Sequence, residues 1–371
     1  QFLYFIGCHL TPPMLRNRFT TCAGRTLATS ATAAVGAAPS AAVRCHTLPD
    51  FEKPRILVTG ANGQIGSELV DAFRAKFGKF NVVATDIRKP RAHRYQSGPF
   101  QFLDVMDKNA IEKVIVDNNI SWVIHLSAIM SVLGEAQPQK CIDLNITGLT
   151  NVLELARVHN LRCFAPSTMA VFSPDSGKVM TKDDTMLNPT TVYGVTKVFL
   201  EQLGAYYARK FDVDFRCLRY PGIISADTLP GGGTTDYAVW MYHYALDKKK
   251  YTCPVLPDEP LPMMYMPDCL RGSVEYISAP KEQLTRNVYN ITGMSFSPDE
   301  LHKSITKHLP LEMEYVPGVA QEIANSWPDS MDDSNAAADF GWKPEWDIDA
   351  MTREMLSEIA KSKGLPSPVK P

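Results

Sequence analysis

Several features are scarce in this 371-residue sequence, and each absence argues against a class of protein. No apolar run approaches the roughly 20 residues that a membrane-spanning helix needs, so we expect no membrane partner. The formal net charge is only -2, which gives no reason to expect a nucleic acid as partner. None of the eight cysteines forms a C-x-x-C pair, which argues against a structural zinc site and a disulfide scaffold. Cys163 and Cys217 lie in apolar runs and are expected to be buried thiols.

Acidic residues are absent from the first 49 positions. This segment is rich in Ser, Thr and Ala and contains Arg16, Arg18, Arg25 and Arg44. Such a composition is typical of an organelle transit peptide, so we predict that residues 1–50 are a disordered leader to the mitochondrial matrix. Met14 is a natural start, in which case residues 1–13 are upstream sequence. The alternative is a disordered tail that carries no targeting signal.

From Pro54 onward, short apolar runs alternate with helical patterns. Continuous apolar runs are typical of parallel strands that are covered on both faces. Strands are expected at 56–58, 82–86, 100–104, 122–126, 162–165 and 213–218. Helices are expected at 66–77, 110–116, 140–159 and 193–211. This order predicts an α/β fold with a doubly wound parallel (Rossmann) sheet over residues 54–220.

The alternation ends after residue 220, where Pro and Gly cluster at 230–233 and again between 254 and 267. We interpret residues 221–364 as a smaller substrate-binding lobe that is interleaved with the last elements of the Rossmann sheet. It is expected to end in a helix over 348–361, and residues 365–371 are interpreted as a tail.

A dinucleotide site is predicted at the end of the first strand. That strand leads directly into Thr59-Gly60-Ala61-Asn62-Gly63-Gln64-Ile65-Gly66. Glycines let the backbone turn sharply near a pyrophosphate, and the helix that follows offers free N–H groups and its positive dipole end. Asp86 ends the second strand, where a carboxylate can accept hydrogen bonds from both ribose hydroxyls of NAD and would repel the 2′-phosphate of NADP. Arg88 is close enough to complicate this argument, but the carboxylate of Asp86 leads us to predict NAD.

Asp104 and Val105 follow the third strand. Asp104 could bind the adenine amino group while Val105 packs on the ring. The alternative is that Asp104 only caps the next helix.

The predicted acid–base pair is Tyr193 and Lys197, which lie four residues apart on one helix face. Oxidation of an alcohol needs a base for the hydroxyl proton, and a free tyrosine with a pKa near 10 is a poor base at pH 7. A lysine ammonium and the positive nicotinamide ring could stabilise the phenolate. Thr168, after the fifth strand, is expected to hold the substrate oxygen in line with Tyr193, and we prefer it to the adjacent Ser167. The alternatives are a surface lysine with a packing tyrosine, and an ordinary turn at the strand end.

These residues belong to a set of motifs by which residues 54–364 resemble the extended short-chain dehydrogenase/reductase family. The motifs are Thr59-Gly60-x-x-Gly63-x-x-Gly66, His125-Leu126-Ser127-Ala128, Leu144-Asn145-Ile146-Thr147-Gly148, Tyr193-x-x-x-Lys197 and Tyr220-Pro221-Gly222-Ile223. Within the family, segments 192–199, 219–225, 230–238 and 326–330 are most similar to the mitochondrial enzymes that oxidise L-threonine at its third carbon.

The resemblance implies that Thr168 and Tyr193 handle the substrate hydroxyl, and that Lys197 also binds the nicotinamide ribose. It implies a homodimer in which helices 140–159 and 193–211 pair across a two-fold axis. The residues expected to contact NAD are Gly60, Asn62, Gly63, Gln64, Ile65, Gly66, Asp86, Ile87, Arg88, Asp104, Val105, Leu126, Ser127, Ala128, Asn145, Tyr193, Lys197 and Ile223. Ser131, Thr234 and Thr235 are candidates for the substrate carboxylate, because hydroxyls and loop amides can bind one.

Three other functions are alternatives to this one. A nucleotide-sugar epimerase or dehydratase of this family usually presents an arginine to the diphosphate, just before a strand that ends in an acid such as Asp268. Residues 251–270 contain no Arg or Lys, and burying a diphosphate without a cation is costly, which favours a small substrate. A non-catalytic NAD-binding regulator often loses the tyrosine or the lysine, and both are present. The cysteine spacing does not support a zinc-dependent medium-chain dehydrogenase.

Overall fold

The central sheet of the computed structural model is parallel throughout, and its strand order is β11-β7-β5-β4-β1-β2-β3, with the short β6 paired to β7. The structure describes residues 53–369, so the predicted leader and the last two residues of the predicted tail lie outside the described residues. The strands are β1 (Ile56–Thr59), β2 (Val82–Asp86), β3 (Phe100–Phe102), β4 (Trp122–His125), β5 (Arg162–Phe164), β6 (Ser167–Thr168), β7 (Phe215–Tyr220) and β11 (Val288–Asn290). The strand order reverses between β1 and β4, and the crevice at the carboxyl ends of these strands is where doubly wound sheets bind ligands.

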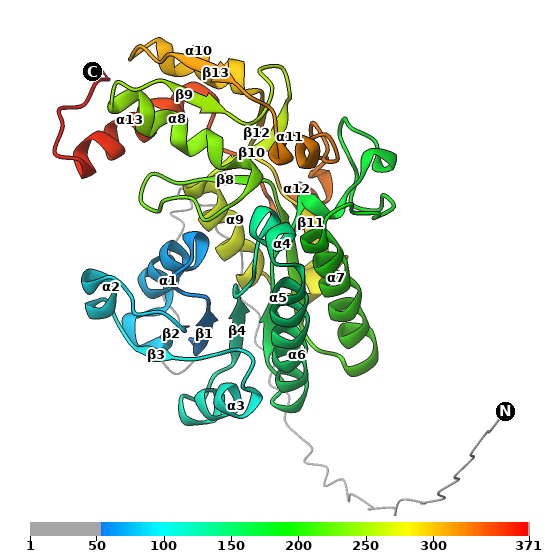
Figure 1. Cartoon of the computed structure of the whole chain (residues 1–371). Coiled ribbons are helices and arrows are strands. Elements are labelled where there is room, and N and C mark those ends of the chain that lie inside the picture. The colour runs from blue at the N-terminus through cyan, green and yellow to red at the C-terminus, as the bar shows by residue number, and fades with distance from the viewer. Residues whose placement is uncertain (1–52, 370–371) are drawn as a thin grey trace, which may run out of the picture. The chain divides into compact units, whose positions relative to one another are not determined.

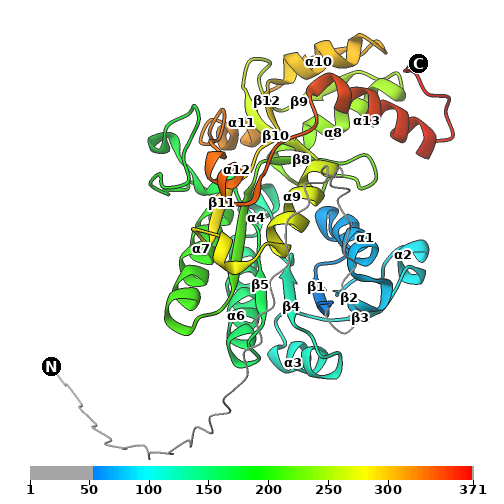
Figure 2. The same cartoon turned by 180° about the vertical axis from the view of Figure 1, so that it is seen from behind.

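Helices cover both faces of this sheet, as predicted from the continuous apolar strands (Figures 1 and 2). Helices α1 (Gln64–Phe77) and α9 (Met266–Ser278) pack on the face to which Ile56 and Val58 point. Helices α3 (Lys108–Asp117), α6 (Gly148–Val158) and α7 (Val192–Phe211) share the opposite core with Leu57. Neighbouring residues of β1 are therefore buried on opposite faces. The predicted doubly wound α/β fold is confirmed.

A smaller lobe is built mainly from residues after 220 and has its own core. It contains a three-stranded sheet, ordered β12-β10-β8, and a two-stranded sheet of β13 and β9. These strands are β8 (Gly222–Ile224), β9 (Tyr251–Cys253), β10 (Leu261–Tyr265), β12 (Met294–Phe296) and β13 (Met313–Tyr315). Its helices are α8 (Tyr237–Leu246), α10 (Pro298–Thr306), α11 (Val319–Ala324) and α13 (Ile348–Ser362), whereas α12 (Ser334–Phe340) packs beside β11 on the core of the main sheet. β11 leaves this part of the chain to join the main sheet beside β7, so the two parts are interleaved.

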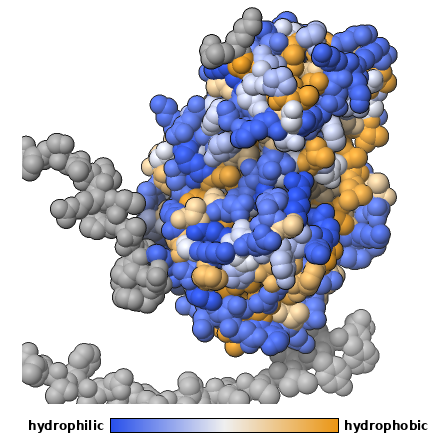
Figure 3. All heavy atoms as spheres, turned by 90° about the vertical axis from the view of Figure 1, so that its left-hand side faces the viewer, coloured by the Kyte–Doolittle hydropathy of each residue, from blue (hydrophilic) through white to orange (hydrophobic). Residues whose placement is uncertain are grey.

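The remaining elements are short. They are α2 (Ala92–Gln96), α4 (Ser131–Ala136), α5 (Pro138–Ile142), a π-helical turn at Asp143–Thr147, and 3-10 turns at Lys79–Asn81, Met169–Val171, Pro174–Ser176, Thr234–Asp236 and Lys281–Gln283. The face that carries α1 and α2 is largely hydrophilic, with apolar residues in small groups (Figure 3). Among the helices of residues 53–369, none combines the length and apolarity that a bilayer crossing requires. The described residues belong to one compact unit, 48–371, so the predicted division near residue 220 stays a prediction.

Several predicted elements have different bounds in the structure, and two of the differences have a clear physical reason. The helix predicted over 140–159 begins at Pro138 and is widened by the π-helical turn before α6. The strand predicted over 213–218 runs from Phe215 to Tyr220. Asp212, which caps α7, has a φ of 56°, so the chain is still turning just before this strand. Arg219 interrupts the apolar run in the sequence, but it lies inside the strand because it is paired with a buried glutamate.

Candidate active site

The glycine-rich turn between β1 and α1 packs directly against the chain that leaves β4. Gly60 has a φ of 66°, and a Cβ atom there would lie 2.8 Å from the carbonyl carbon of Leu126 and the nitrogen of Ser127. A Cβ at Gly66 would lie 2.3 Å from the carbonyl oxygen of Gly60. The turn therefore needs glycine at both positions for steric reasons. It places the start of α1, with its free N–H groups, at the crevice where the strand order reverses.

Asp86 lies at the carboxyl end of β2, beside this turn, and is buried. Its carboxylate accepts hydrogen bonds from the backbone nitrogens of Asn62 (3.0 Å) and Arg88 (2.9 Å). The side-chain amide of Asn62 in turn donates to the carbonyl oxygen of Arg88 (2.6 Å). These bonds fix the carboxylate at the edge of the crevice, while the Ile87 side chain is exposed.

A small basic pocket adjoins Asp86. Its lining includes Arg88, Lys89, Arg91 and Arg94. Arg94 is paired with Asp71 (3.1 Å) and with Asp227, whereas Arg88 approaches Asp86 at 3.4 Å. Asp86 is therefore a negative charge at the border of a positive region.

Asp104 does not cap the next helix, so that alternative is wrong. Asp107 is the N-cap of α3 and accepts a hydrogen bond from the nitrogen of Ala110 (3.0 Å). Asp104 instead accepts one from the nitrogen of Met106 (2.9 Å) in the preceding turn. The side chain of Val105 is buried in the core that lies under α3 and α6.

A cleft beside the glycine-rich turn holds about 1020 Å³ of space outside the protein atoms, open solvent at its mouth included. Its lining brings together many of the predicted site residues, namely Gly60, Gly63, Gln64, Ile65, Gly66, Leu126, Ala128, Ser131, Thr168, Tyr193, Lys197, Ile223, Thr234 and Thr235. The other predicted residues lie outside this lining, namely Asn62, Asp86, Ile87, Arg88, Asp104, Val105, Ser127 and Asn145. The lining comes from the turn after β1, α1, the chain after β4, β6, α7, the end of β7, β8 and the lobe, so only the fold assembles it.

Tyr193 and Lys197 lie in the first two turns of α7, and both are buried. The helix begins where Thr191 accepts a hydrogen bond from the nitrogen of Gly194 (3.1 Å). The Lys197 ammonium lies 5.7 Å from the centre of the Tyr193 ring and donates to the carbonyl oxygen of Pro166 (2.7 Å). Thr168, on β6, shares a hydrogen bond with Tyr193.

Burial dominates the electrostatics of this cleft. It raises the pKa of Tyr193 above its ordinary value of 10, which the hydrogen bond to Thr168 only partly offsets. The lower Tyr193 pKa expected from the sequence is therefore not found in the protein alone. Burial also lowers the pKa of Lys197 to about 8. His125, whose ring shares a 3.0 Å hydrogen bond with Thr59, has its pKa lowered to about 3 by burial.

Asn145 lies in the π-helical turn, and its side chain connects the segment after β4 to α7. Its side chain accepts a hydrogen bond from the nitrogen of Ile129 (2.9 Å) and donates to the carbonyl oxygen of the same residue (3.0 Å). It also donates to the hydroxyl of Thr196 on α7 (3.0 Å). The segment after β4 is thus tied to the helix that carries Tyr193. Extra turns of this kind are often found at functional sites.

Trp327 is a lining residue that the sequence argument did not assign. Residues 326–330 are part of the family resemblance described above, but the sequence assigns no chemical role to them. The indole is 4% exposed, and among the described residues its Nε1 has no hydrogen-bond partner. Across the same cleft, the buried hydroxyls of Ser131 and Thr234 lie 3.3 Å apart. A buried donor without a partner is costly, so this indole is available to a ligand.

The described residues that line the cleft include Lys197 as their only lysine or arginine. The apolar segment Leu261–Tyr265, noted in the sequence, forms β10 and is fully buried beside β8. Away from the glycine-rich turn, the cleft therefore offers hydroxyls and an indole where a second diphosphate would need cations.

Comparison with known proteins agrees with this geometry. Residues 56–292 match the model of the NAD dependent epimerase/dehydratase family. This match covers more than half of the sequence. The chain belongs to that family. The predicted family resemblance and the prediction of NAD as cofactor are thereby confirmed.

Individual relatives are similar over most of the chain. The mitochondrial L-threonine 3-dehydrogenase of Bos taurus is 47% identical over 310 residues, which are 83% of each protein. The solved structure of L-threonine 3-dehydrogenase from Trypanosoma brucei is 55% identical with a TM-score of 0.82, over 85% of this chain and 99% of that one. A monomeric L-threonine 3-dehydrogenase from a metagenome is 44% identical with a TM-score of 0.80, over 83% of this chain and 99% of that one.

Proposed function

We propose that this protein is an L-threonine 3-dehydrogenase, which oxidises L-threonine with NAD⁺ to 2-amino-3-ketobutyrate and NADH. The observation that carries the proposal is the cleft in which Tyr193, Lys197 and Thr168 meet the glycine-rich turn. The names of the two similar proteins from Bos taurus and Trypanosoma brucei support the choice of substrate.

In this proposal Tyr193 is the base that takes the proton of the threonine hydroxyl. Thr168 shares a hydrogen bond with Tyr193 and holds the substrate oxygen beside it. When bound, NAD⁺ supplies the hydride acceptor and a positive charge near the phenol. Because burial raises the pKa of Tyr193 in the protein alone, the phenolate depends on that charge and on the Lys197 ammonium.

The glycine-rich turn, Leu126, Ala128 and Ile223 line the cleft, which supports their proposed contacts with NAD. Asp86 is held at the edge of the crevice and is the group proposed to bind the adenosine ribose. Of the proposed contacts, Asn145 uses its side chain within the protein, and Val105 is buried in the core, so we propose that Asn145 acts by holding the segment after β4. Asp104 remains proposed for the adenine.

The substrate carboxylate is proposed to lie among Ser131, Thr234, Thr235 and Trp327. The paired hydroxyls and the unpartnered indole N–H are neutral donors that suit a single carboxylate. A nucleotide sugar carries a diphosphate, and the lining offers it no cation besides Lys197. A non-catalytic regulator is disfavoured because both Tyr193 and Lys197 are present and lie together.

The decisive experiment is NADH formation by the purified chain with L-threonine, L-serine, 3-hydroxybutyrate and UDP-sugars. Threonine should give the highest kcat/KM. A higher value for another member of the panel would overturn the substrate assignment.

We further propose a homodimer and a mitochondrial location. Exposed apolar side chains lie on α5 (Ile142), α6 (Val158) and α7 (Val195, Tyr206 and Phe211), the elements of the predicted interface. Light scattering should give twice the monomer mass. A stable active monomer would refute the dimer, and the metagenome protein is named as monomeric. The Bos taurus relative is named as mitochondrial, which supports the location. Mass spectrometry of the native protein should find a mature N-terminus near residue 50.

A further inference from the structure

A buried ion pair lies directly behind the proposed acid–base residues and has no role in the function proposed above. Glu201, on α7, and Arg219, on β7, are 2% and 4% exposed. The guanidinium of Arg219 donates to both carboxylate oxygens of Glu201, at 2.9 Å from Nε and 2.7 Å from Nη2. Burying such a pair costs solvation that its attraction often only balances, so stability alone is a weak reason for its presence.

Glu201 continues the stripe of Tyr193 and Lys197 on one face of α7, at a spacing of four residues. This stripe faces the short segment Pro166 to Thr168, and each residue of the segment forms a hydrogen bond with one residue of the stripe. The Lys197 ammonium donates to the carbonyl oxygen of Pro166 (2.7 Å), and the hydroxyl of Ser167 donates to Glu201 (2.5 Å). Thr168 shares its hydrogen bond with Tyr193. Glu201 therefore fixes the middle residue of a segment whose neighbours contact the proposed acid–base pair.

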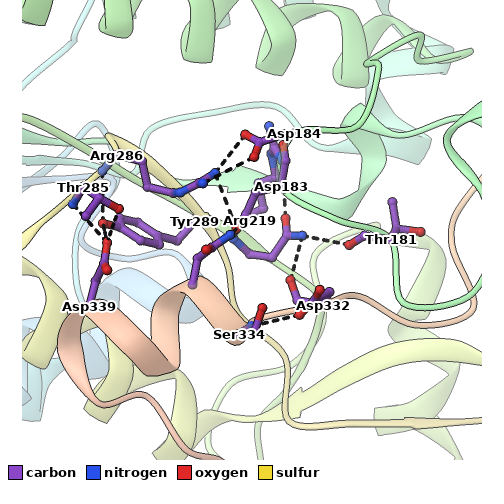
Figure 4. Close-up of polar contacts among 12 residues, drawn as sticks. Thr181, Asp183, Asp184, Arg219, Thr285, Arg286, Tyr289, Asp332, Ser334 and Asp339 are labelled. Atoms are coloured by element: carbon purple, nitrogen blue, oxygen red, sulfur yellow. Dashed lines mark hydrogen bonds and ion pairs between the residues drawn. The ribbon is translucent and has the colours of Figure 1, made fainter.

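Arg219 extends the same contacts to the lobe (Figure 4). Its Nη1 donates to the carbonyl oxygen of Asp183 (2.8 Å), and the carboxylate of Asp183 accepts a hydrogen bond from the nitrogen of Asn290 (2.5 Å). The Asn290 side chain donates to the carbonyl oxygens of Thr181 (3.0 Å) and Asp332 (3.1 Å). Hydrogen bonds between the backbones of 178–181 and 329–332 then hold the segment that carries Trp327. Hydrogen bonds thus connect this one buried pair both to the segment that carries Thr168 and to the segment that carries Trp327.

The charge of Glu201 also acts on Lys197. The groups that face Lys197 are Tyr193 and Glu201 on α7, Cys141 on α5, Cys217 on β7 and His125 on β4. Burial raises the pKa values of both thiols and lowers that of His125 to about 3, so these three groups are neutral near pH 7. Glu201 is therefore the group in this set that carries a negative charge and favours the ammonium form of Lys197. Removing its charge would also leave the Arg219 guanidinium uncompensated.

We propose that the Glu201–Arg219 pair is a positioning pair for the reaction: Glu201 holds Ser167, and with it Thr168, in place and puts its carboxylate one helical turn from the Lys197 ammonium. Neither residue is a catalytic residue, because neither lines the cleft. The inference rests on the proposed roles of Tyr193 and Lys197.

The test compares pH profiles of kcat/KM for threonine in the full-length protein. Glu201→Gln keeps the shape of the side chain and removes its charge, so it should lower kcat about tenfold or more. It should also move the alkaline fall of the profile to lower pH by about one unit, because Lys197 then loses its proton more easily. Glu201→Asp keeps the charge but has a shorter side chain that cannot hold Ser167 in the same way. It should therefore lower kcat while the alkaline fall of the profile stays at the wild-type pH. Ser167→Ala, which leaves the ion pair intact, should behave like Glu201→Asp.

The matched control is Asp214→Asn. Asp214 precedes β7 at the end away from the cleft and pairs with Arg162 (2.6 Å) and Arg216 (2.8 Å). This variant should lose thermal stability and keep the wild-type pH profile. The inference is overturned if Glu201→Gln has the same pH profile of kcat/KM as Asp214→Asn. If Glu201→Gln does not fold, the inference is overturned when Ser167→Ala retains full kcat.

A failure of the proposed function would look different. It would appear as a wild-type protein that does not oxidise threonine, or as a Tyr193→Phe variant that keeps most of its rate. If wild type is active and Tyr193→Phe is not, a normal profile for Glu201→Gln counts against the positioning pair alone.

Discussion

Replacing Trp327 with phenylalanine tests the substrate side of the cleft most directly. The indole is buried and its N–H has no partner among the described residues, so the free protein bears the cost of an unsatisfied donor, about 1–3 kcal/mol. A hydrogen bond from this N–H to the threonine carboxylate would contribute about 1.5–3 kcal/mol, the usual range for a charged partner. Trp327→Phe should therefore lower kcat/KM for threonine by a factor of about 10 to 150.

The same substitution should have little effect on stability. It removes the unsatisfied donor, and this gain offsets the loss of packing from a smaller ring, about 1 kcal/mol. The free energy of unfolding should then change by no more than about 1 kcal/mol. Since the bond is made to a group that does not react, the effect should fall on KM and spare kcat.

Trp342 provides the matched control. It is buried as well, but its Nε1 donates to the carboxylate of Asp333 (2.9 Å). Trp342→Phe leaves that carboxylate without this donor, so it should lose about 1–3 kcal/mol of stability and keep the wild-type KM. Steady-state kinetics and urea unfolding of both variants measure these quantities. A wild-type KM in Trp327→Phe, or equal losses of stability in the two variants, would refute the assignment of the indole to the substrate.

Three further predictions follow from the site. Tyr193→Phe should lower kcat by about 10²–10⁴, the usual contribution of a general base, while the Kd for NAD⁺, measured by fluorescence titration, changes little. The wild-type protein should prefer NAD⁺ to NADP⁺ by at least about tenfold in kcat/KM, or about 1.4 kcal/mol, because the carboxylate of Asp86 repels a 2′-phosphate; comparable efficiencies would contradict this role, and Asp86→Ser should narrow the gap because the neighbouring basic pocket remains. His125 has its pKa lowered to about 3, so the unfolded chain takes up a proton below pH 6.5 that the folded protein does not, and stability falls as the pH falls through this window. Between pH 7 and pH 5 this loss in the free energy of unfolding amounts to about 2 kcal/mol. Urea unfolding of His125→Asn at both pH values should show a loss that is smaller than that of the wild-type protein by about this amount.

Much of the fold was predictable because it follows from local patterns. The continuous apolar runs at Ile56–Val58 and Val82–Ala84 predict strands buried on both faces, and the structure confirms them. The glycines at 60 and 66 have a local steric cause as well, since a side chain at either position would meet backbone atoms. Tyr193 and Lys197 share a helix face by spacing alone.

The elements that escaped prediction depend on distant partners. β6 has only two residues, and its pairing with β7 defines it as a strand. The strand β7 continues through Arg219 because Glu201 neutralises the guanidinium, and this pairing is not visible in a hydropathy pattern. The role of Asp104 was open between an adenine contact and the cap of α3. In the structure, Asp107 caps that helix.

The sequence by itself determined the sheet, the glycine-rich turn and the choice of NAD, and it singled out the proposed acid–base residues, because each depends on neighbours close in the chain. Only the tertiary structure decided how the site is completed. Trp327 reaches the cleft from a segment more than 100 residues after Tyr193, held there by hydrogen bonds to residues 178–181. The pKa values of Tyr193 and Lys197 are likewise tertiary properties, because burial by several elements sets them and the sequence fixes only their ordinary values.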